Sequence, residues 1–347
     1  MAEHPAGHSG SPPGLDLDRA APYLAQVVPV EQGGDLAASV IAGGKSNLTY
    51  VVTGGGTTVV LRRPPLGHVL PSAHDMVREF RVISAMSRAG FPVPTPLLLC
   101  EDPDVIGAPF YLMSYVDGVV LRTEADNARL TPALARRCGE NLVDVLLALH
   151  RIDPAAVGLD GFGRPEGYLR RQVTRWHQQW ERSQTRELPL LEQVTEGLVT
   201  SIPASSAVGI VHGDYRLDNV MFDHDLTHVE AVLDWEMATL GDPLADVGLF
   251  VVYTNLTAQG LSLTTARLGP EQGFPAATEL AEWYARGSGI PLDRLDWYIA
   301  LGYYKLAIIG EGIHARYLQG KTVGEGFEAL GAKVPYLVEQ AHEALAR

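Results

Sequence analysis

Short segments in which apolar and polar residues alternate dominate the first third of the chain, and this alternation is typical of half-buried strands. Residues 36–43, 48–53 and 57–63 follow one another through glycine-containing connections, which predicts a three-stranded antiparallel meander. Two further strands are predicted at 92–100 and 109–116. The N-terminal part of the chain is therefore expected to form a small antiparallel sheet.

One helix, over residues 72–89, is predicted beside this sheet, with Ser72 as its N-cap and Gly90 directly after its end. Glu79 borders the apolar stripe of this helix, so its carboxylate is expected to need a cation. Arg62, on the third strand, is the candidate partner. Because side chains alternate between the two faces of a strand, Arg62 is preferred over Arg63 for this role.

From residue 131 onward the apolar residues recur at helical spacing. A helix with Asp242 as N-cap and Pro243 at its first position is also expected. The predicted fold class is therefore α+β, with a small lobe at 17–116 and a larger, mostly helical lobe at 117–347. Residues 1–16, rich in Pro, Gly, Ser and His, are predicted to be a disordered tail. The other predicted helices cover residues 131–150, 167–183, 275–287, 293–318 and 323–346.

Composition narrows the classes of partner and compartment. The chain has 347 residues and a net charge of −14, and such an acidic excess argues against a nucleic-acid partner. No apolar run reaches the ~18 residues of a membrane span, and the N-terminus does not read as a signal peptide. The two cysteines form neither a disulfide framework nor a metal motif. These features predict a cytoplasmic protein and leave its oligomeric state open.

The stretch 212–219 carries the candidate chemistry, because it lies between two short apolar runs that read as strands. Asp214 and Asn219 lie in this stretch, and Asp234 follows a third run. Oxygen ligands without dense Cys or His suit Mg²⁺, which is commonly shared with the phosphates of a nucleotide. Asn219 and Asp234 are thus the predicted metal ligands, and Asp214 the predicted base that orients and deprotonates a hydroxyl acceptor.

The same residues allow a rival interpretation, a metal-dependent hydrolase that uses His212 and the aspartates as ligands. Two-metal hydrolytic sites usually need denser His and Asp than this stretch offers. His212 is instead expected to fix the loop through hydrogen bonds, and Asp218 is expected either to orient metal-bound waters or to hold the turn.

The motif HGDYRLDN at 212–219, followed by LDWE at 233–236, resembles the aminoglycoside phosphotransferase family, whose members have a bilobal protein-kinase-like fold. The resemblance is nearest to the branch of kinase-like domains fused to acyl-CoA dehydrogenases. Further segments that match this family are VLRRPP at 60–65, REF at 78–80, PVP at 92–94, FYLM at 110–113 and GDPLAD at 241–246.

The resemblance implies an enzyme that binds ATP, or alternatively GTP, together with Mg²⁺, and that phosphorylates a small-molecule hydroxyl. It implies that Asp214 is the catalytic aspartate, and that Arg62 stands where kinases carry lysine, paired with Glu79. It further implies a glycine loop over the phosphates and a hinge that meets adenine. The residues it assigns to that loop are Gly44, Ser46 and Asn47, and those it assigns to the hinge are Ser114, Tyr115 and Val116.

The acceptor is the open part of this prediction. Arginines are concentrated between residues 164 and 186, and they form either a solvated helix face or an anion-binding rim. The rim would suit an anionic acceptor such as a hydroxyacyl-CoA. Arg171, Arg175 and Glu236 are the candidate substrate contacts. A cationic aminoglycoside is the alternative acceptor, and a nucleotide-binding module without chemistry is the alternative of another class. A protein kinase is disfavoured, because no activation-loop segment separates Asp234 from the helix expected at Asp242.

Overall fold

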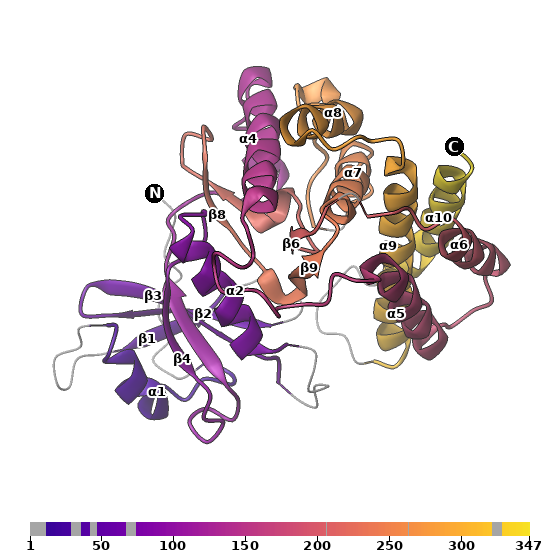
Figure 1. The fold of residues 1–347 in the computed structure, drawn as a ribbon. Coiled ribbons are helices and arrows are strands. Elements are labelled where there is room, and N and C mark those ends of the chain that lie inside the picture. The colour runs from indigo at the N-terminus through magenta and orange to yellow at the C-terminus, as the bar shows by residue number, and fades with distance from the viewer. Residues whose placement is uncertain are drawn as a thin grey trace. The chain divides into compact units, whose positions relative to one another are not determined.

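The computed structural model divides into two compact units, which are described separately. Unit 1 consists of Met1–Gly118 and Glu230–Glu236, and unit 2 of Val119–Val229 and Met237–Arg347. Figure 1 shows the N-terminal sheet of unit 1 in indigo to purple and the helices of unit 2 in magenta to yellow. The residues that the structure describes are 12–28, 36–41, 47–66, 74–205, 207–262, 264–320 and 328–347.

Unit 1 is built on a five-stranded antiparallel sheet with the order β1-β2-β3-β5-β4, so the predicted sheet is confirmed (Figure 1). Helix α2 (Met76–Arg88) packs on β4 and β5. The strand predicted at 109–116 ends earlier, at Ser114. The strands are β1 (Ala37–Val40), β2 (Leu48–Gly54), β3 (Thr57–Arg63), β4 (Pro96–Cys100) and β5 (Phe110–Ser114).

The start of α2 differs from the prediction. Asp75 is the N-cap, and its side chain accepts a hydrogen bond from the backbone N–H of Arg78 at 3.0 Å. The predicted cap, Ser72, lies outside the described residues. Asp75 caps well because its short carboxylate satisfies an N–H of the first turn that has no partner within the helix.

A short helix that was not predicted, α1 (Leu17–Leu24), covers the face of the sheet opposite α2. Leu15, just before it, is only 1% exposed, and the Tyr50 hydroxyl donates to the carbonyl of Pro13 at 2.6 Å. The predicted tail of residues 1–16 therefore extends too far toward the helix. The apolar residues of β2 and β3 on this face need a cover, and residues 13–24 supply it.

The segment Glu230–Glu236 belongs to unit 1, although a division by sequence assigns it to the larger lobe. The Val232 N–H donates to the carbonyl of Pro92 at 2.8 Å, and the rings of Trp235 and Phe91 meet edge to face at 5.8 Å. These contacts fix the segment that carries Asp234. The strand in this segment is β8 (Val229–Val232), and a short 3₁₀ helix, η2 (Trp235–Met237), follows it.

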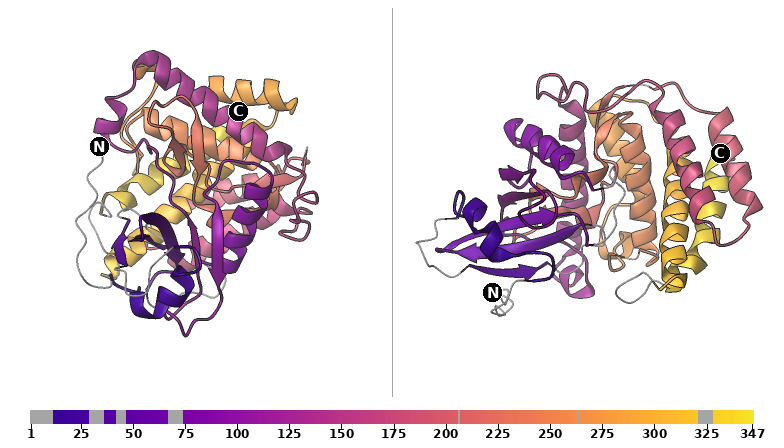
Figure 2. Two further views of the ribbon diagram at one scale, coloured as in Figure 1. Left: turned by 90° about the vertical axis from the view of Figure 1, so that its left-hand side faces the viewer. Right: turned by 90° about the horizontal axis from the view of Figure 1, so that it is seen from below.

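Unit 2 is mostly helical, as predicted, and contains short strands around the candidate catalytic loop. Helix α9 packs against α5, α7 and α10, and Figure 2 shows α7 and α9 side by side. The strands β6 (Gly209–Val211) and β9 (Thr239–Gly241) pair antiparallel, and β7 (Val220–Phe222) follows the loop. The helices are α3 (Glu124–Asn127), α4 (Pro132–Arg151), α5 (Tyr168–Ser183), α6 (Pro189–Thr200), α7 (Leu244–Ala258), α8 (Ala277–Ser288), α9 (Leu295–Leu318) and α10 (Glu328–Leu345).

The start of α7 lies one residue later than predicted. Its first residue is Leu244, with Pro243 at the N-cap position. Asp242 still acts as a cap, because its Oδ1 accepts from the backbone N–H of Leu244 at 3.0 Å. Within the part of the chain that the structure describes, no helix has the length and apolar character to span a membrane.

Candidate active site

The candidate catalytic loop connects β6 to the 3₁₀ helix η1 (Leu217–Asn219) in unit 2. Gly213 in this loop has φ = 83°, and a Cβ placed there would lie 2.8 Å from the carbonyl oxygen of Met237. Both observations require glycine at this position. The close approach lets the loop turn directly after β6 and present Asp214.

Asp246, in the first turn of α7, anchors this loop. It is fully buried, and its Oδ2 and Oδ1 accept from the backbone N–H groups of His212 and Gly213 at 2.7 and 2.8 Å. His150 Nε2 lies 3.2 Å from Oδ2. Burial alone would raise the pKa of Asp246, but the His150 and backbone hydrogen bonds lower it below its ordinary value.

The Asp214 carboxylate is held on both oxygens. Asn219 Nδ2 donates to Oδ2 at 3.0 Å and to the main-chain carbonyl of Asp214 at 2.9 Å. Arg216 Nε lies 3.3 Å from the same Oδ2. The hydroxyl of Tyr253, from α7, donates to Oδ1 at 2.5 Å. The side chain of Asp214 is 17% exposed, so it is accessible to a reactant.

The electrostatics around Asp214 favour its ionised form. Burial would raise its pKa, but the charges of Arg216 and Lys305 and the hydrogen bond from Tyr253 outweigh burial and lower it. Lys305, from α9, is 8% exposed and donates to the Gly213 carbonyl at 2.5 Å. A buried lysine beside the loop therefore keeps the carboxylate charged and able to accept a proton.

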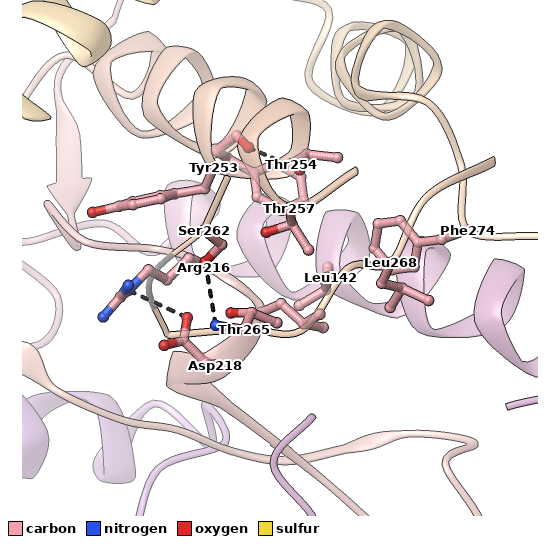
Figure 3. Close-up of a pocket in the computed structure, with 12 residues that line it drawn as sticks. Leu142, Arg216, Asp218, Tyr253, Thr254, Thr257, Ser262, Thr265, Leu268 and Phe274 are labelled. Atoms are coloured by element: carbon pink, nitrogen blue, oxygen red, sulfur yellow. Dashed lines mark hydrogen bonds and ion pairs between the residues drawn. The ribbon is translucent and has the colours of Figure 1, made fainter. Parts of the chain in front are cut away.

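Asp218 lies close to the same Arg216 nitrogen as Asp214. Arg216 Nε is 3.4 Å from Asp218 Oδ1, and the Asp218 carbonyl accepts from Arg122 at 3.1 Å. Figure 3 shows Arg216, Asp218 and Tyr253 at one end of a pocket whose other end is apolar, at Leu268 and Phe274. Asp218 thus holds Arg216 in place, a role that the sequence left open.

In unit 1, Arg62 joins two carboxylates. Its Nε lies 2.9 Å from Glu79 Oε1, and its Nη2 lies 2.6 Å from Asp234 Oδ1. The structure thus contains the Arg62–Glu79 pair that the sequence predicted. Arg63 points to the opposite face of β3, where it donates to the carbonyls of Gly14 and Ile106. Strand parity was therefore a sound guide to which arginine meets Glu79.

Arg62 and Glu79 are largely buried, and the neighbouring charges shift the pKa of each of them. Burial would lower the pKa of Arg62, but Glu79 and then Asp234 raise it above its ordinary value. Burial raises the pKa of Glu79, which is 2% exposed, and Arg62 opposes this shift. Asp234 has φ = 65°, an uncommon conformation for a residue other than glycine that is found preferentially at functional sites.

Asn47 and Glu236 extend this cluster. Asn47 Nδ2 donates to Glu236 Oε2 at 3.1 Å, with Glu79 Oε2 at 3.5 Å. His74 Nδ1 lies 2.8 Å from Asn47 Oδ1 and 3.7 Å from Glu236. Glu236, predicted as a substrate contact, therefore stands among residues predicted to bind the nucleotide. The predicted loop residues Gly44 and Ser46 lie outside the described residues.

The predicted hinge lies at the end of β5. Ser114 Oγ accepts from the Thr95 N–H at 2.8 Å, and the Tyr115 side chain is 41% exposed. Val116 is partly buried. These positions are compatible with backbone contacts to a ligand, and adenine binding here stays a prediction.

The two predicted substrate arginines on α5 have different surroundings. The Arg171 guanidinium donates to the carbonyls of Arg164 and Glu166, so it holds the loop before the helix. Burial is the main cause of the lowered pKa of the Lys305 amine, and the positive charge of Arg175 lowers this pKa further. Arg175 is thus the better candidate for a contact with an anionic acceptor.

Sequence reasoning missed Tyr253 and Lys305, both of which surround the candidate base. Tyr253 lies in an apolar helical run and gives no signal. Lys305 does give one, because it is a single lysine inside the long apolar pattern of 293–318. Among the residues that the structure describes, no group of three or more His, Cys, Asp or Glu side chains could hold a metal. A Mg²⁺ shared with phosphates uses fewer protein ligands than that.

Comparison with known proteins gives a consistent result. Acyl-CoA dehydrogenase family member 11 of Gallus gallus is 36% identical over 322 residues, which cover 91% of this chain and 41% of that protein. Acyl-CoA dehydrogenase family member 10 of Mus musculus is 36% identical over 301 residues, or 86% of this chain and 28% of that protein. The chain thus spans less than half the length of these curated relatives.

Solved structures agree with the sequence relatives. A provisionally assigned aminoglycoside phosphotransferase of Ralstonia eutropha has a TM-score of 0.79 and 30% identity, with 95% of this chain and 98% of that chain covered. The aminoglycoside phosphotransferase APH(4)-Ia, solved with ADP and hygromycin B, has a TM-score of 0.59 and 17% identity, with 89% and 94% covered, and supports the fold alone. Because the family model described as "Phosphotransferase enzyme family" also matches residues 37–283, the chain belongs to that kinase-like family of enzymes.

Proposed function

We propose that this protein is an ATP- and Mg²⁺-dependent small-molecule kinase that transfers the γ-phosphoryl group to the hydroxyl of an anionic, acyl-CoA-type acceptor. The observation that carries the proposal is the surroundings of the Asp214 carboxylate. Its pKa is lowered, Asn219 fixes one of its oxygens, and the other oxygen accepts from the Tyr253 hydroxyl. A general base needs this combination of a charged form and hydrogen-bond reach.

The oxygen donors present fit Mg²⁺. Asn219 uses its Nδ2 to hold Asp214, which leaves its carbonyl oxygen for a cation. Asp234 Oδ1 accepts a hydrogen bond from Arg62, which leaves Oδ2 for a cation. Hard oxygen ligands of this kind suit Mg²⁺, which when bound would neutralise charge on the nucleotide phosphates. Arg62 would orient those phosphates, because its position is fixed by Glu79.

The charges near Asp214 support an anionic acceptor. Arg216 and Lys305 lower the pKa of Asp214, and Arg175 acts on Lys305. Because Arg216 is shared between Asp214 and Asp218, the charge left for an anionic acceptor, a carboxylate or a CoA phosphate, is that of the exposed Arg175. The names of the curated relatives, both acyl-CoA dehydrogenase family members, support a CoA-linked hydroxy acid as the first acceptor class to test.

The test is ATP consumption in the presence of hydroxyacyl-CoAs, aminoglycosides, choline-like alcohols and sugars. We expect turnover with hydroxyacyl-CoAs, and loss of at least about 100-fold in kcat for Asp214→Ala, since a general base contributes ~10²–10⁴-fold. ADP binding should persist in this variant. Turnover that survives Asp214→Ala would contradict the assigned base, and turnover with aminoglycosides alone would contradict the acceptor class.

The role of Arg175 has a test of its own. Arg175→Ala should raise the KM for the anionic acceptor and leave kcat largely unchanged, because the charge acts on binding. Arg182→Ala, also exposed on α5, is the matched control and should leave KM unchanged. An equal effect of both substitutions would assign the attraction to the net charge of the helix and not to Arg175.

A further inference from the structure

We propose that the Tyr253 hydroxyl occupies the base Asp214 when no acceptor is bound, and that it thereby suppresses transfer of the phosphoryl group of ATP to water. This inference rests on the proposed kinase function. It gives a role to a side chain that the catalytic assignment leaves without one.

The geometry favours one oxygen of Asp214 for a reacting hydroxyl. Oδ2 accepts a hydrogen bond from Asn219 Nδ2 at 3.0 Å and lies 3.3 Å from the charged Arg216 Nε. Oδ1 receives the Tyr253 hydroxyl at 2.5 Å. A base must be within hydrogen-bond reach of the proton it accepts, and Oδ1, which already accepts from a hydroxyl, is the oxygen expected to meet the acceptor. Tyr253 thus stands where the acceptor hydroxyl is expected.

The ring of Tyr253 is held against a charged neighbour. Its backbone belongs to the helix α7. The Arg216 guanidinium lies 5.1 Å from the centre of the Tyr253 ring. In Figure 3 the Tyr253 hydroxyl and the Arg216 guanidinium point toward the same side of the pocket. The contacts with Arg216 and Asp214 therefore hold the hydroxyl at Oδ1.

Water and an acceptor differ in their ability to displace this hydroxyl. A water molecule offers one hydrogen bond to Oδ1 and competes with a donor that is already tethered at the site. An acceptor brings binding energy from the rest of its structure, which can be used to displace the tyrosine. The contact thus discriminates between two hydroxyl nucleophiles of similar chemistry.

The suppressed step is ATP hydrolysis. The water oxygen forms a bond to the γ-phosphorus, the bond from that phosphorus to the β,γ-bridging oxygen breaks, and the proton of the water passes to Asp214 Oδ1. ADP and inorganic phosphate leave. With Tyr253 on Oδ1, the water must compete with a hydroxyl that is already in place for the lone pairs of that oxygen, so the step is slow.

The test is ADP release from MgATP without any acceptor. Tyr253→Phe keeps the ring against Arg216 and removes the hydroxyl, and we expect ADP release to rise by about tenfold, the size of effect of one hydrogen bond to a charged group. Tyr253→Leu removes the same hydroxyl with a different side-chain shape and should give a rise as well. Tyr304→Phe is the matched control, because it removes a buried hydroxyl that pairs with Thr195 at 2.9 Å, and it should leave the rate unchanged.

The outcomes separate this inference from the proposed function. Asp214→Ala, added to Tyr253→Phe, should abolish the gain, because the water then has no base. If neither Tyr253 variant releases ADP faster than the wild type while Asp214→Ala is slower, the inference about Tyr253 is wrong and the kinase function stands. If the wild type and Asp214→Ala release ADP equally and phosphorylate no acceptor, both are wrong.

Discussion

At the scale of single residues, Arg62 stabilises the sheet of unit 1 and also belongs to the proposed phosphate site. Its partner Glu79 is 2% exposed, so the loss of the arginine would leave a buried carboxylate without a cation. Arg62→Met is expected to lower the free energy of unfolding by ~3 kcal/mol, the usual cost of breaking a buried ion pair. Urea denaturation measures this change.

A second variant distinguishes the loss of the ion pair from the loss of packing at Arg62. In Arg62→Met combined with Glu79→Gln, no buried charge is left alone, so much of the lost stability should return. If the double variant is as unstable as the sum of the two single variants, the Arg62–Glu79 pair is not what holds this part of the sheet.

The residues of the site could be predicted to different degrees. Asp214 and Arg62 were accessible, the first from a local motif and the second from strand parity. Tyr253 and Lys305 were not, because each comes from a distant helix and reaches the loop only after α7 and α9 have packed. Local spacing predicts contacts within one element, and contacts between elements depend on the tertiary packing.

At the scale of elements, α7 links the catalytic loop to the helical core through Asp246. The folded-state pKa of this carboxyl lies below its ordinary value, so its contribution to stability is complete above the unfolded pKa of ~3.9 and is lost as the pH falls through the folded pKa. The urea midpoint of the wild type should therefore fall steeply below about pH 4.

Substitution at position 246 provides the check on that pH dependence. Asp246→Asn should be less stable at pH 7 by ~2 kcal/mol, the value of hydrogen bonds to a charged group, and its midpoint should depend less on pH. Asp293→Asn, on an exposed residue, should follow the wild type. A wild-type curve as flat as that of Asp246→Asn would remove Asp246 from the acid-sensitive groups.

The contact between α7 and α9 is unusually close at Gly248. A Cβ there would lie 2.6 Å from the backbone carbonyl carbon of Tyr298, so Gly248→Ala must separate the two helices. We expect a loss of roughly 1–3 kcal/mol, the cost of overpacking, and lower activity, because Tyr253 and Lys305 come from these helices. Thermal unfolding and ATP consumption measure the two effects.

The control for Gly248 is Gly312→Ala on α9. A Cβ at Gly312 would meet Ser183 Oγ at 3.6 Å and Gln179 Nε2 at 3.7 Å, which are ordinary contacts. Both glycines lie inside helices and gain the same helix propensity on substitution, so Gly312→Ala should be neutral or slightly stabilising. A similar loss in both variants would mean that the tight α7–α9 contact is not the cause.

The elements themselves could be predicted where one periodicity ran for many residues. The strands of unit 1 and the helices α4 and α9 have such patterns. Helix α1 did not, because it has only 8 residues, contains Pro22 and is stabilised by the sheet that it covers. Its formation depends on tertiary packing more than on propensity, which is the general condition of short helices.

At the scale of the whole molecule, the predicted metal ligands belong to different compact units. Asn219 lies in unit 2 and Asp234 in unit 1, although the two are close in the sequence. A division of the chain into two continuous lobes therefore does not describe it, because the segment 230–236 returns to the sheet of unit 1. Each predicted ligand can be tested through the stabilisation that a bound metal–nucleotide complex gives.

The thermal unfolding of the protein with nucleotide tests the metal assignment of each residue. MgATP at about 100 times its Kd should stabilise the wild type by ~2.7 kcal/mol, and ATP with EDTA should stabilise it less. The increment that depends on Mg²⁺ should disappear in Asn219→Ala and Asp234→Ala and persist in Asp214→Ala, since Asp214 is assigned to the acceptor hydroxyl. The comparison uses the Mg²⁺-dependent increment and not the absolute Tm. Asp234→Ala also removes an ion-pair partner of Arg62, which changes the Tm without any ligand. If the increment persists in both ligand variants, the metal assignment of Asn219 and Asp234 is wrong.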